Sequence, residues 1–160
     1  GTAPPPLEAE SLALGASVRV GPRTTIEVLS PPSTPLAGRE SRNDRSLVLL
    51  VTLGERRVLV AADIEAAAER WLVDSGRSLD AEALVVPHHG SRTSSTPTFI
   101  EAVSPAVAVV SAGVANQFGH PHPEVVRRYE AAGARVLNTA DRGSVTLSFP
   151  SGHLEVTTAR

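Results

Sequence analysis

The chain has 160 residues and a formal net charge of −2, so it can bury one sizeable core and carries no strong field toward nucleic acid or anionic membranes. It contains no cysteine, which excludes disulfides and thiolate metal sites and leaves histidine and carboxylates as possible metal ligands. No apolar run approaches the roughly 18–20 residues that a membrane helix needs.

The start of the chain differs in composition from the rest. It opens with prolines at residues 4–6, and the whole chain contains no methionine. We interpret residues 1–16 as a linker or the tail of an upstream segment, and residues 17–160 as one domain. Together these features favour a fragment of a longer protein.

The first part of the domain predicts strands. Alternating apolar residues at 17–20 and 24–29 indicate a hairpin, and the apolar runs 46–53 and 57–61 indicate a second one. The long proline-rich stretch between them, residues 30–45, predicts a loop, and loops of this length are often functional in compact domains.

From residue 64 onward, the pattern alternates between helices and strands. The expected helices are residues 64–74, 97–103 and 124–132, and the expected strands are 83–86, 106–111, 135–137, 144–149 and 154–157. Strands followed by a strand–helix alternation predict an α/β fold in which helices cover a mixed sheet.

Polar side chains capable of chemistry follow three of the predicted strands. They are Asp63, then His88 and His89, then Asn116, His120 and His122. Ligands bind beyond the carboxyl ends of strands in α/β sheets, so these residues are expected to converge. Neutral imidazoles and a carboxylate suit a divalent ion at about 2.0–2.2 Å, and such an ion lowers the pKa of bound water toward about 7.

Asp63 and His122 also have a purely structural interpretation. Asp63 precedes a predicted helix and has the properties of an N-cap, worth about 1 kcal/mol. His122 precedes Pro123 and could only start a helix, and His153 is interpreted as a surface residue in a terminal turn.

A hydroxyl-rich segment follows the two histidines. Ser91, Thr93, Ser94 and Ser95 either form a solvated loop that caps the next helix or receive an anion at the N-terminus of that helix. In the second interpretation Arg92 is a phosphate clamp, because its planar guanidinium matches phosphate oxygens.

The order of these motifs resembles the metallo-β-lactamase-like domain of the ComEC competence-protein family. The matching blocks are residues 43–48 (Asn-Asp-Arg-Ser-Leu-Val), 62–65 (Ala-Asp-Ile-Glu), 88–91 (His-His-Gly-Ser) with 93–95, 116–125 (Asn-Gln-Phe-Gly-His-Pro-His-Pro-Glu-Val) and 138–143. The resemblance covers roughly residues 19–149. It implies an αββα sandwich, here largely its C-terminal half.

The resemblance also implies roles for individual residues. Asp63 matches the metal-bridging aspartate, and one of His88 and His89 matches the late histidine ligand. We prefer His89 as the ligand and place His88 beside the substrate, although the sequence leaves this choice open. His120 and Asn116 line the site in such proteins, and the metal is Zn²⁺ or Mn²⁺.

For the parent protein, the resemblance implies an integral-membrane DNA channel of natural transformation. The domain is then a soluble part on the extracytoplasmic side of the cytoplasmic membrane, acting as a nuclease or phosphodiesterase on the DNA strand that is not taken up. Its partners are DNA, the N-terminal half of the domain and the membrane channel.

Two departures limit what carries over. No histidine precedes His88, so the histidine-rich motif that holds most of the metal in this fold is absent, and Ala62 stands where the family usually has glycine. We therefore expect little hydrolysis by the chain alone and an exposed face that promotes homodimerisation. The alternatives are a non-catalytic module that binds DNA or a partner, and a single-metal hydrolase built from Asp63, His88, His89, His120 and His122.

Overall fold

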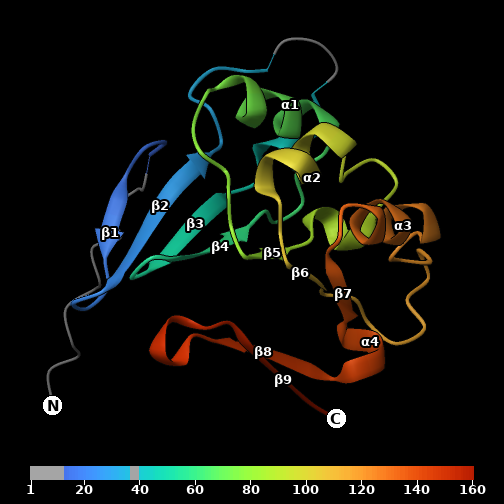
Figure 1. The fold of residues 1–160 in the computed structure, drawn as a ribbon. Coiled ribbons are helices and arrows are strands. Elements are labelled where there is room, and N and C mark those ends of the chain that lie inside the picture. Colours follow the sequence, from blue (N-terminus) through green and yellow to red (C-terminus); the bar gives the residue numbers. More distant parts are fainter. Residues whose placement is uncertain (1–12, 37–39) are drawn as a thin grey trace, which may run out of the picture.

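A computed structural model describes residues 13–36 and 40–160 of the chain. The prediction for residues 1–12 lies outside the described residues. Seven strands form one mixed sheet in the order of the sequence (Figure 1). They are β1 (Ser17–Arg19), β2 (Thr24–Ser30), β3 (Val48–Leu53), β4 (Arg56–Val60), β5 (Ala83–Val85), β6 (Val107–Val110) and β7 (Arg135–Asn138).

The sheet changes character at its centre. Strands β1 to β4 pair antiparallel, whereas β4, β5, β6 and β7 run parallel to one another. The parallel half needs helical crossovers between its strands, which are supplied by α1 (Ala66–Asp74), α2 (Pro97–Val103) and α3 (Pro123–Ala131). Because β4, β5 and β6 are parallel, their carboxyl ends lie at one edge of the sheet.

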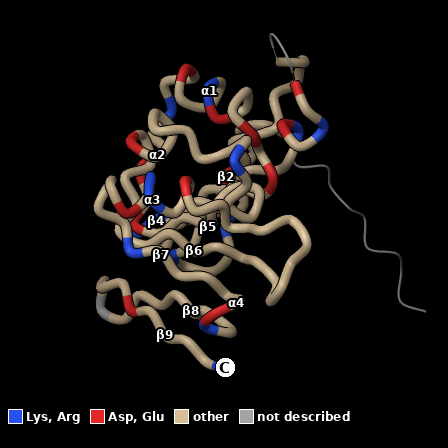
Figure 2. The backbone as a smooth tube through the Cα atoms, turned by 90° about the vertical axis from the view of Figure 1, so that its right-hand side faces the viewer, with Lys and Arg blue, Asp and Glu red and all other residues tan. Residues whose placement is uncertain are grey.

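The three helices cover one face of the sheet and bury the main core there (Figure 1). Its largest buried side chains from the helices include Leu72, Phe99 and Tyr129. A smaller cluster lies on the opposite face, beneath a separate hairpin of β8 (Ser144–Ser148) and β9 (Glu155–Ala159). Figures 1 and 2, in perpendicular views, both show this hairpin on the side of the sheet away from the helices. The predicted α/β class with a mixed, helix-covered sheet is confirmed.

The hairpin covers only part of the second face. It packs on Ala83, Val107, Val109 and Leu137 of the parallel strands. Toward the antiparallel edge, Ile26, Leu49 and Val51 share that face through the strand register and are only partly buried. Instead of a fully exposed face, the sheet carries a half-buried apolar patch at this edge, and homodimerisation stays a prediction.

Short helical turns complete the described structure. They are η1 (Asn43–Arg45), η2 (Pro87–Gly90), α4 (Thr139–Arg142) and η3 (Pro150–Gly152). The sequence pattern predicted loop or turn at each of these places, because none is long enough to show a helical period. None of the helices in the described ranges has the length and hydrophobicity to span a bilayer.

Candidate functional site

The carboxyl ends of the central strands bring the predicted site residues together. Asp63 follows β4, His88 and His89 follow β5, and the loop of residues 111–122 follows β6. Backbone hydrogen bonds join the first two segments, since the His88 N–H donates to the Ala62 carbonyl at 2.9 Å. The predicted convergence of these three strand ends is therefore observed.

The backbone at this edge is strained. Ala62, His88 and His89 have φ values of 48°, 48° and 55°, in the left-handed region that residues with a Cβ rarely adopt. Such strain costs roughly 1–3 kcal/mol per residue and tends to occur at functional sites. The left-handed backbone at Ala62 also explains why glycine would be the easier residue there.

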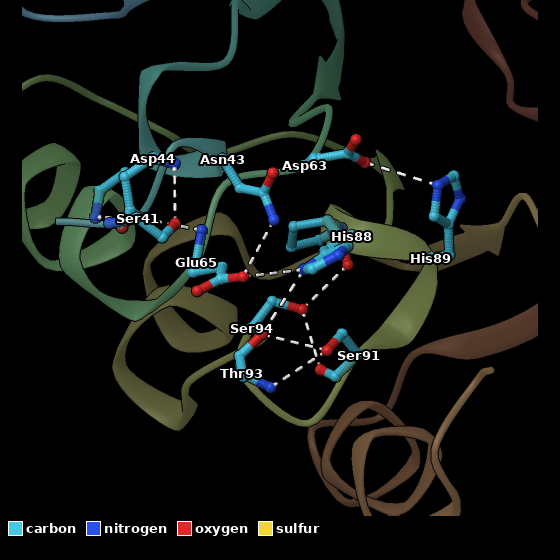
Figure 3. Close-up of polar contacts among 12 residues, drawn as sticks. Ser41, Asn43, Asp44, Asp63, Glu65, His88, His89, Ser91, Thr93 and Ser94 are labelled. Atoms are coloured by element: carbon cyan, nitrogen blue, oxygen red, sulfur yellow. Dashed lines mark hydrogen bonds and ion pairs between the residues drawn. The ribbon is translucent and has the colours of Figure 1, made fainter. Parts of the chain in front are cut away.

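Asp63 and His89 form the pair that best fits a metal ion (Figure 3). The Nε2 atom of His89 lies 3.5 Å from Oδ1 of Asp63, and about half of each side chain is exposed. Nδ1 of His89 lies 2.7 Å from the Ser111 carbonyl, which can only accept, so Nδ1 carries a proton and in the neutral ring Nε2 has the lone pair. Two ligands about 2.1 Å from one tetrahedral ion lie about 3.4 Å apart, close to the observed separation.

The two residues supply only part of a metal site. Among the described residues, no group of three or more His, Asp or Glu side chains is placed to hold one ion. The arrangement of the described residues gives no support to the alternative of a self-contained single-metal site. The imidazole of His88 faces Glu65, and that of His122 contacts Arg92 and the Glu124 N–H. The order of strand ends in the sequence does not reveal the direction in which each ring points.

His88 belongs to a separate hydrogen-bonded cluster with two residues that the site prediction did not include (Figure 3). Its Nδ1 lies 3.2 Å from Oε1 of Glu65, and the same oxygen accepts a hydrogen bond from Nδ2 of Asn43 at 3.1 Å. The Nδ1 atom of His88 thus faces Glu65 and the Thr93 hydroxyl rather than the Asp63–His89 pair. Asn43 and Glu65 both lie in sequence blocks that resemble the competence family. That resemblance is the sequence signal that could have identified them as site residues.

His120 and His89 line the same cleft of 460 Å³. Burial, followed by the neighbouring His88, His89 and His122, lowers the pKa of His120 below its ordinary value. Its Nδ1 atom is buried and has no hydrogen-bond partner among the described residues. A neutral imidazole with an unused nitrogen is thus present at the rim of the site.

Asn116 stabilises the loop of residues 111–122. Its Nδ2 donates to the His120 carbonyl at 2.7 Å, and its Oδ1 accepts from the His120 N–H at 2.9 Å. Because both ends of the amide hold the backbone of His120, the structure gives Asn116 a positioning role. The prediction that Asn116 takes part directly in catalysis has no support from these contacts.

Arg92 is exposed and rests on His122. Its Nε donates to Nε2 of His122 at 3.2 Å, while Nδ1 of His122 lies 3.3 Å from the Glu124 N–H at the start of α3. A neutral imidazole has one acceptor nitrogen, so the two contacts compete. His122 is the N-cap of α3, as its structural interpretation stated.

The serines of the predicted phosphate loop have internal roles. Ser94 and Ser95 are fully buried, and the Ser94 hydroxyl donates to the Pro87 carbonyl at 2.9 Å. The Ser95 hydroxyl accepts from Tyr129, and the Ser95 N–H donates to buried Glu69. Their burial does not fit the prediction that these hydroxyls receive phosphate. Burial raises the pKa of Glu69, although its backbone hydrogen bonds oppose the shift.

The outer hydroxyls of the same loop are less enclosed. Ser91 is 7% exposed and its Oγ lies 3.0 Å from Oγ1 of exposed Thr93, which also approaches Nδ1 of His88 at 3.5 Å. Thr93 and Arg92 are therefore the members of the predicted phosphate set that reach solvent, and their role in binding remains a prediction.

Asp63 is not the N-cap of α1. The helix begins at Ala66, and Oδ1 of buried Asp44 accepts from the N–H groups of Glu65 and Ala68 at 3.0 and 3.1 Å (Figure 3). The helix is thus capped by a carboxylate more than twenty residues earlier in the chain, which leaves the Asp63 carboxylate free. No local sequence signal predicts a cap of this kind.

Comparison with known proteins identifies relatives of this chain. No protein-family model matches it. It is 40% identical over 111 residues to "Competence protein ComA" of Neisseria gonorrhoeae, covering 69% of this chain and 16% of that protein. It is 34% identical over 122 residues to "ComE operon protein 3" of Bacillus subtilis, covering 76% of this chain and 15% of that protein.

A third relative extends the similarity over more of the chain. "Recombination protein 2" of Haemophilus influenzae is 34% identical over 134 residues, which is 84% of this chain and 16% of that protein. The chain spans about a sixth of the length of the curated relatives that it matches. Similarity at this level to three competence-type proteins, on a fold of the predicted class, shows that the chain belongs to the ComEC competence-protein family.

Proposed function

We propose that this chain forms one side of a metal-dependent phosphodiesterase site that acts on DNA during uptake in natural transformation. The observation that carries the proposal is the Asp63–His89 pair, with its 3.5 Å separation and its free Nε2. The names of the relatives, which refer to competence and recombination, support DNA as the substrate. In this proposal the longer protein contains a membrane channel and places the domain outside the cytoplasmic membrane.

The metal, Zn²⁺ or Mn²⁺, would be held on this side by Asp63 and His89, and the remaining ligands would come from other parts of the longer protein. When bound, such an ion polarises a phosphoryl oxygen and lowers the pKa of a coordinated water. The half-exposed carboxylate and the exposed imidazole leave room for a substrate to approach.

The other residues of the site orient the substrate and handle protons. Nε2 of His88 is the atom that accepts or returns a proton in this proposal, while Nδ1 lies 3.2 Å from the Glu65 carboxylate. Arg92 is exposed at the same rim and supplies a guanidinium for a phosphate oxygen. Asn116 holds the backbone of His120 and thereby sets the position of that imidazole.

The test uses the full-length protein with the variants Asp63→Asn and His89→Ala, and His153→Ala as an exposed control. We expect the first two to lose bound Zn²⁺ or Mn²⁺ by elemental analysis and to lower DNA cleavage about 100-fold or more, because even partners of metal ligands contribute 10–100-fold. Unchanged metal content in both variants would refute the assignment of the ligands.

A second candidate function is a non-catalytic DNA-binding module. It is favoured by the finding that the described residues offer two metal ligands and not three. A full-length protein that binds no metal, cleaves no DNA and binds DNA with a steep salt dependence would support this candidate.

A further inference from the structure

Phe118 is an aromatic side chain that the fold does not bury. It lies in the loop between β6 and α3 and is 71% exposed, whereas Phe99 and Tyr129 are fully enclosed in the core. The chain has only five aromatic residues of the types Phe, Trp and Tyr. Packing therefore does not account for a large apolar ring at this position.

The exposed ring is ordered against the site. Phe118 stacks on His120 with a centroid separation of 5.8 Å and an interplanar angle of 19°, and His120 lies 6.0 Å from His88. The loop is braced by the two hydrogen bonds between Asn116 and His120. One face of the Phe118 ring is covered by an imidazole, and the ring is presented beside the candidate reaction centre.

The ring also borders a cleft that contains a candidate metal ligand. The cleft of 460 Å³ is lined by His89, by residues 111–113, and by Asn116, Phe118 and His120. A flat group entering this cleft would lie next to the ring while its substituents reach the imidazole of His89. A nucleotide whose base stacks on Phe118 and whose phosphate approaches His89 needs this arrangement.

Charge alone would hold a nucleic acid weakly here. The net charge is −2, and acidic and basic residues are intermingled along the described backbone (Figure 2). Arg92 is the arginine that contacts the site through His122. A contact that does not depend on salt is therefore needed for affinity, and stacking of a base on an aromatic ring is such a contact.

We propose that Phe118 is a stacking platform for an unpaired nucleobase of single-stranded DNA, which places the adjacent phosphate at His89. The inference rests on the proposed function and names its substrate class. A base within a duplex has both faces covered by its neighbours, so only an unpaired base can use the ring. A lipid surface fits less well, because inserting Phe118 would bring the nearby imidazoles and Asp63 toward hydrocarbon.

The test measures binding of a fluorescent oligothymidylate to this chain by anisotropy, in a chelating buffer that removes metal from the readout. We expect Phe118→Ala to weaken binding roughly 5- to 100-fold and Phe118→Trp to retain it. Val114→Ala is the matched control, because Val114 is 80% exposed on the same loop. An abasic oligonucleotide with the same number of phosphates should bind the unmodified chain as weakly as oligothymidylate binds Phe118→Ala.

Fluorescence gives a second, independent readout. In the double variant Trp71→Phe/Phe118→Trp the only tryptophan lies at position 118, and oligothymidylate should quench it while the abasic strand should not. Equal affinity of Phe118→Ala and the unmodified chain, equal affinity for abasic and base-bearing strands, or an effect of Phe118→Ala on binding to phospholipid vesicles alone would overturn the inference. Failure of the unmodified full-length protein to bind metal or to cleave DNA would instead refute the proposed function, since neither property enters these measurements.

Discussion

Gly90 joins the two loops that carry the candidate site, and replacing it tests the packing between them. The residue has a φ of 79°, and a Cβ built on it would lie 2.7 Å from Cβ and 3.1 Å from Cα of Pro121. The Gly90 carbonyl accepts the His122 N–H at 2.9 Å, so the backbones cannot separate without losing a hydrogen bond. We expect Gly90→Ala to be strongly destabilising.

The expected loss of stability in Gly90→Ala has two parts. The left-handed backbone costs a residue with a Cβ about 1–2 kcal/mol, and forcing extra volume into a packed contact costs about 1–3 kcal/mol. The free energy of unfolding should therefore fall by roughly 2–5 kcal/mol. Gly133→Ala is the matched control, because Gly133 has a φ of 85° and no atom within 4 Å of the added Cβ. That variant should lose only about 1–2 kcal/mol.

Urea unfolding of both variants measures the difference directly, provided that the slope with denaturant is unchanged. A thermal scan should show Tm falling by about 2–4 °C for each kcal/mol in a domain of this size. Nuclear magnetic resonance signals of residues 116–122 should shift in Gly90→Ala and not in Gly133→Ala. Equal losses of stability in the two variants would show that the contact with Pro121 is not tight, and the reasoning would be refuted.

Four further predictions concern stability, pH and association. Asp44→Asn should lower the free energy of unfolding by about 1–3 kcal/mol in urea, because the buried carboxylate that caps α1 loses its charge; an unchanged midpoint would contradict the capping role. Ala62→Gly should raise the free energy of unfolding by about 0.5–1 kcal/mol by relieving the left-handed backbone, whereas Ala68→Gly inside α1 should lower the same free energy by a similar amount. The lowered pKa of His120 means that the unfolded chain binds more protons than the native chain near the ordinary pKa of 6.5, so stability should fall as the pH drops through that value, and His120→Gln should reduce the slope. The half-buried apolar patch on β2 and β3 should promote dimers at high concentration, and sedimentation that shows only monomers would contradict this.

The sequence by itself determined the elements and their class. Alternating and continuous apolar runs located the strands, and the helical period located α1, α2 and α3 to within a few residues. Both signals are local, since each depends on which side chains share a face of one element. The position of Asp63, His88 and His89 at strand ends was also readable, because parallel strands must end at a common edge.

The tertiary structure decided which of those residues act together. Asp44 replaces Asp63 as the cap of α1, and Glu65 lies beside the imidazole of His88. Packing of the helices buries Ser95 between Glu69 of α1 and Tyr129 of α3. Each of these contacts joins segments about 20 to 35 residues apart in the chain. Which side chains meet depends on their distance and direction after the sheet and helices have packed. A sequence pattern along one strand or helix contains neither the distance nor the direction.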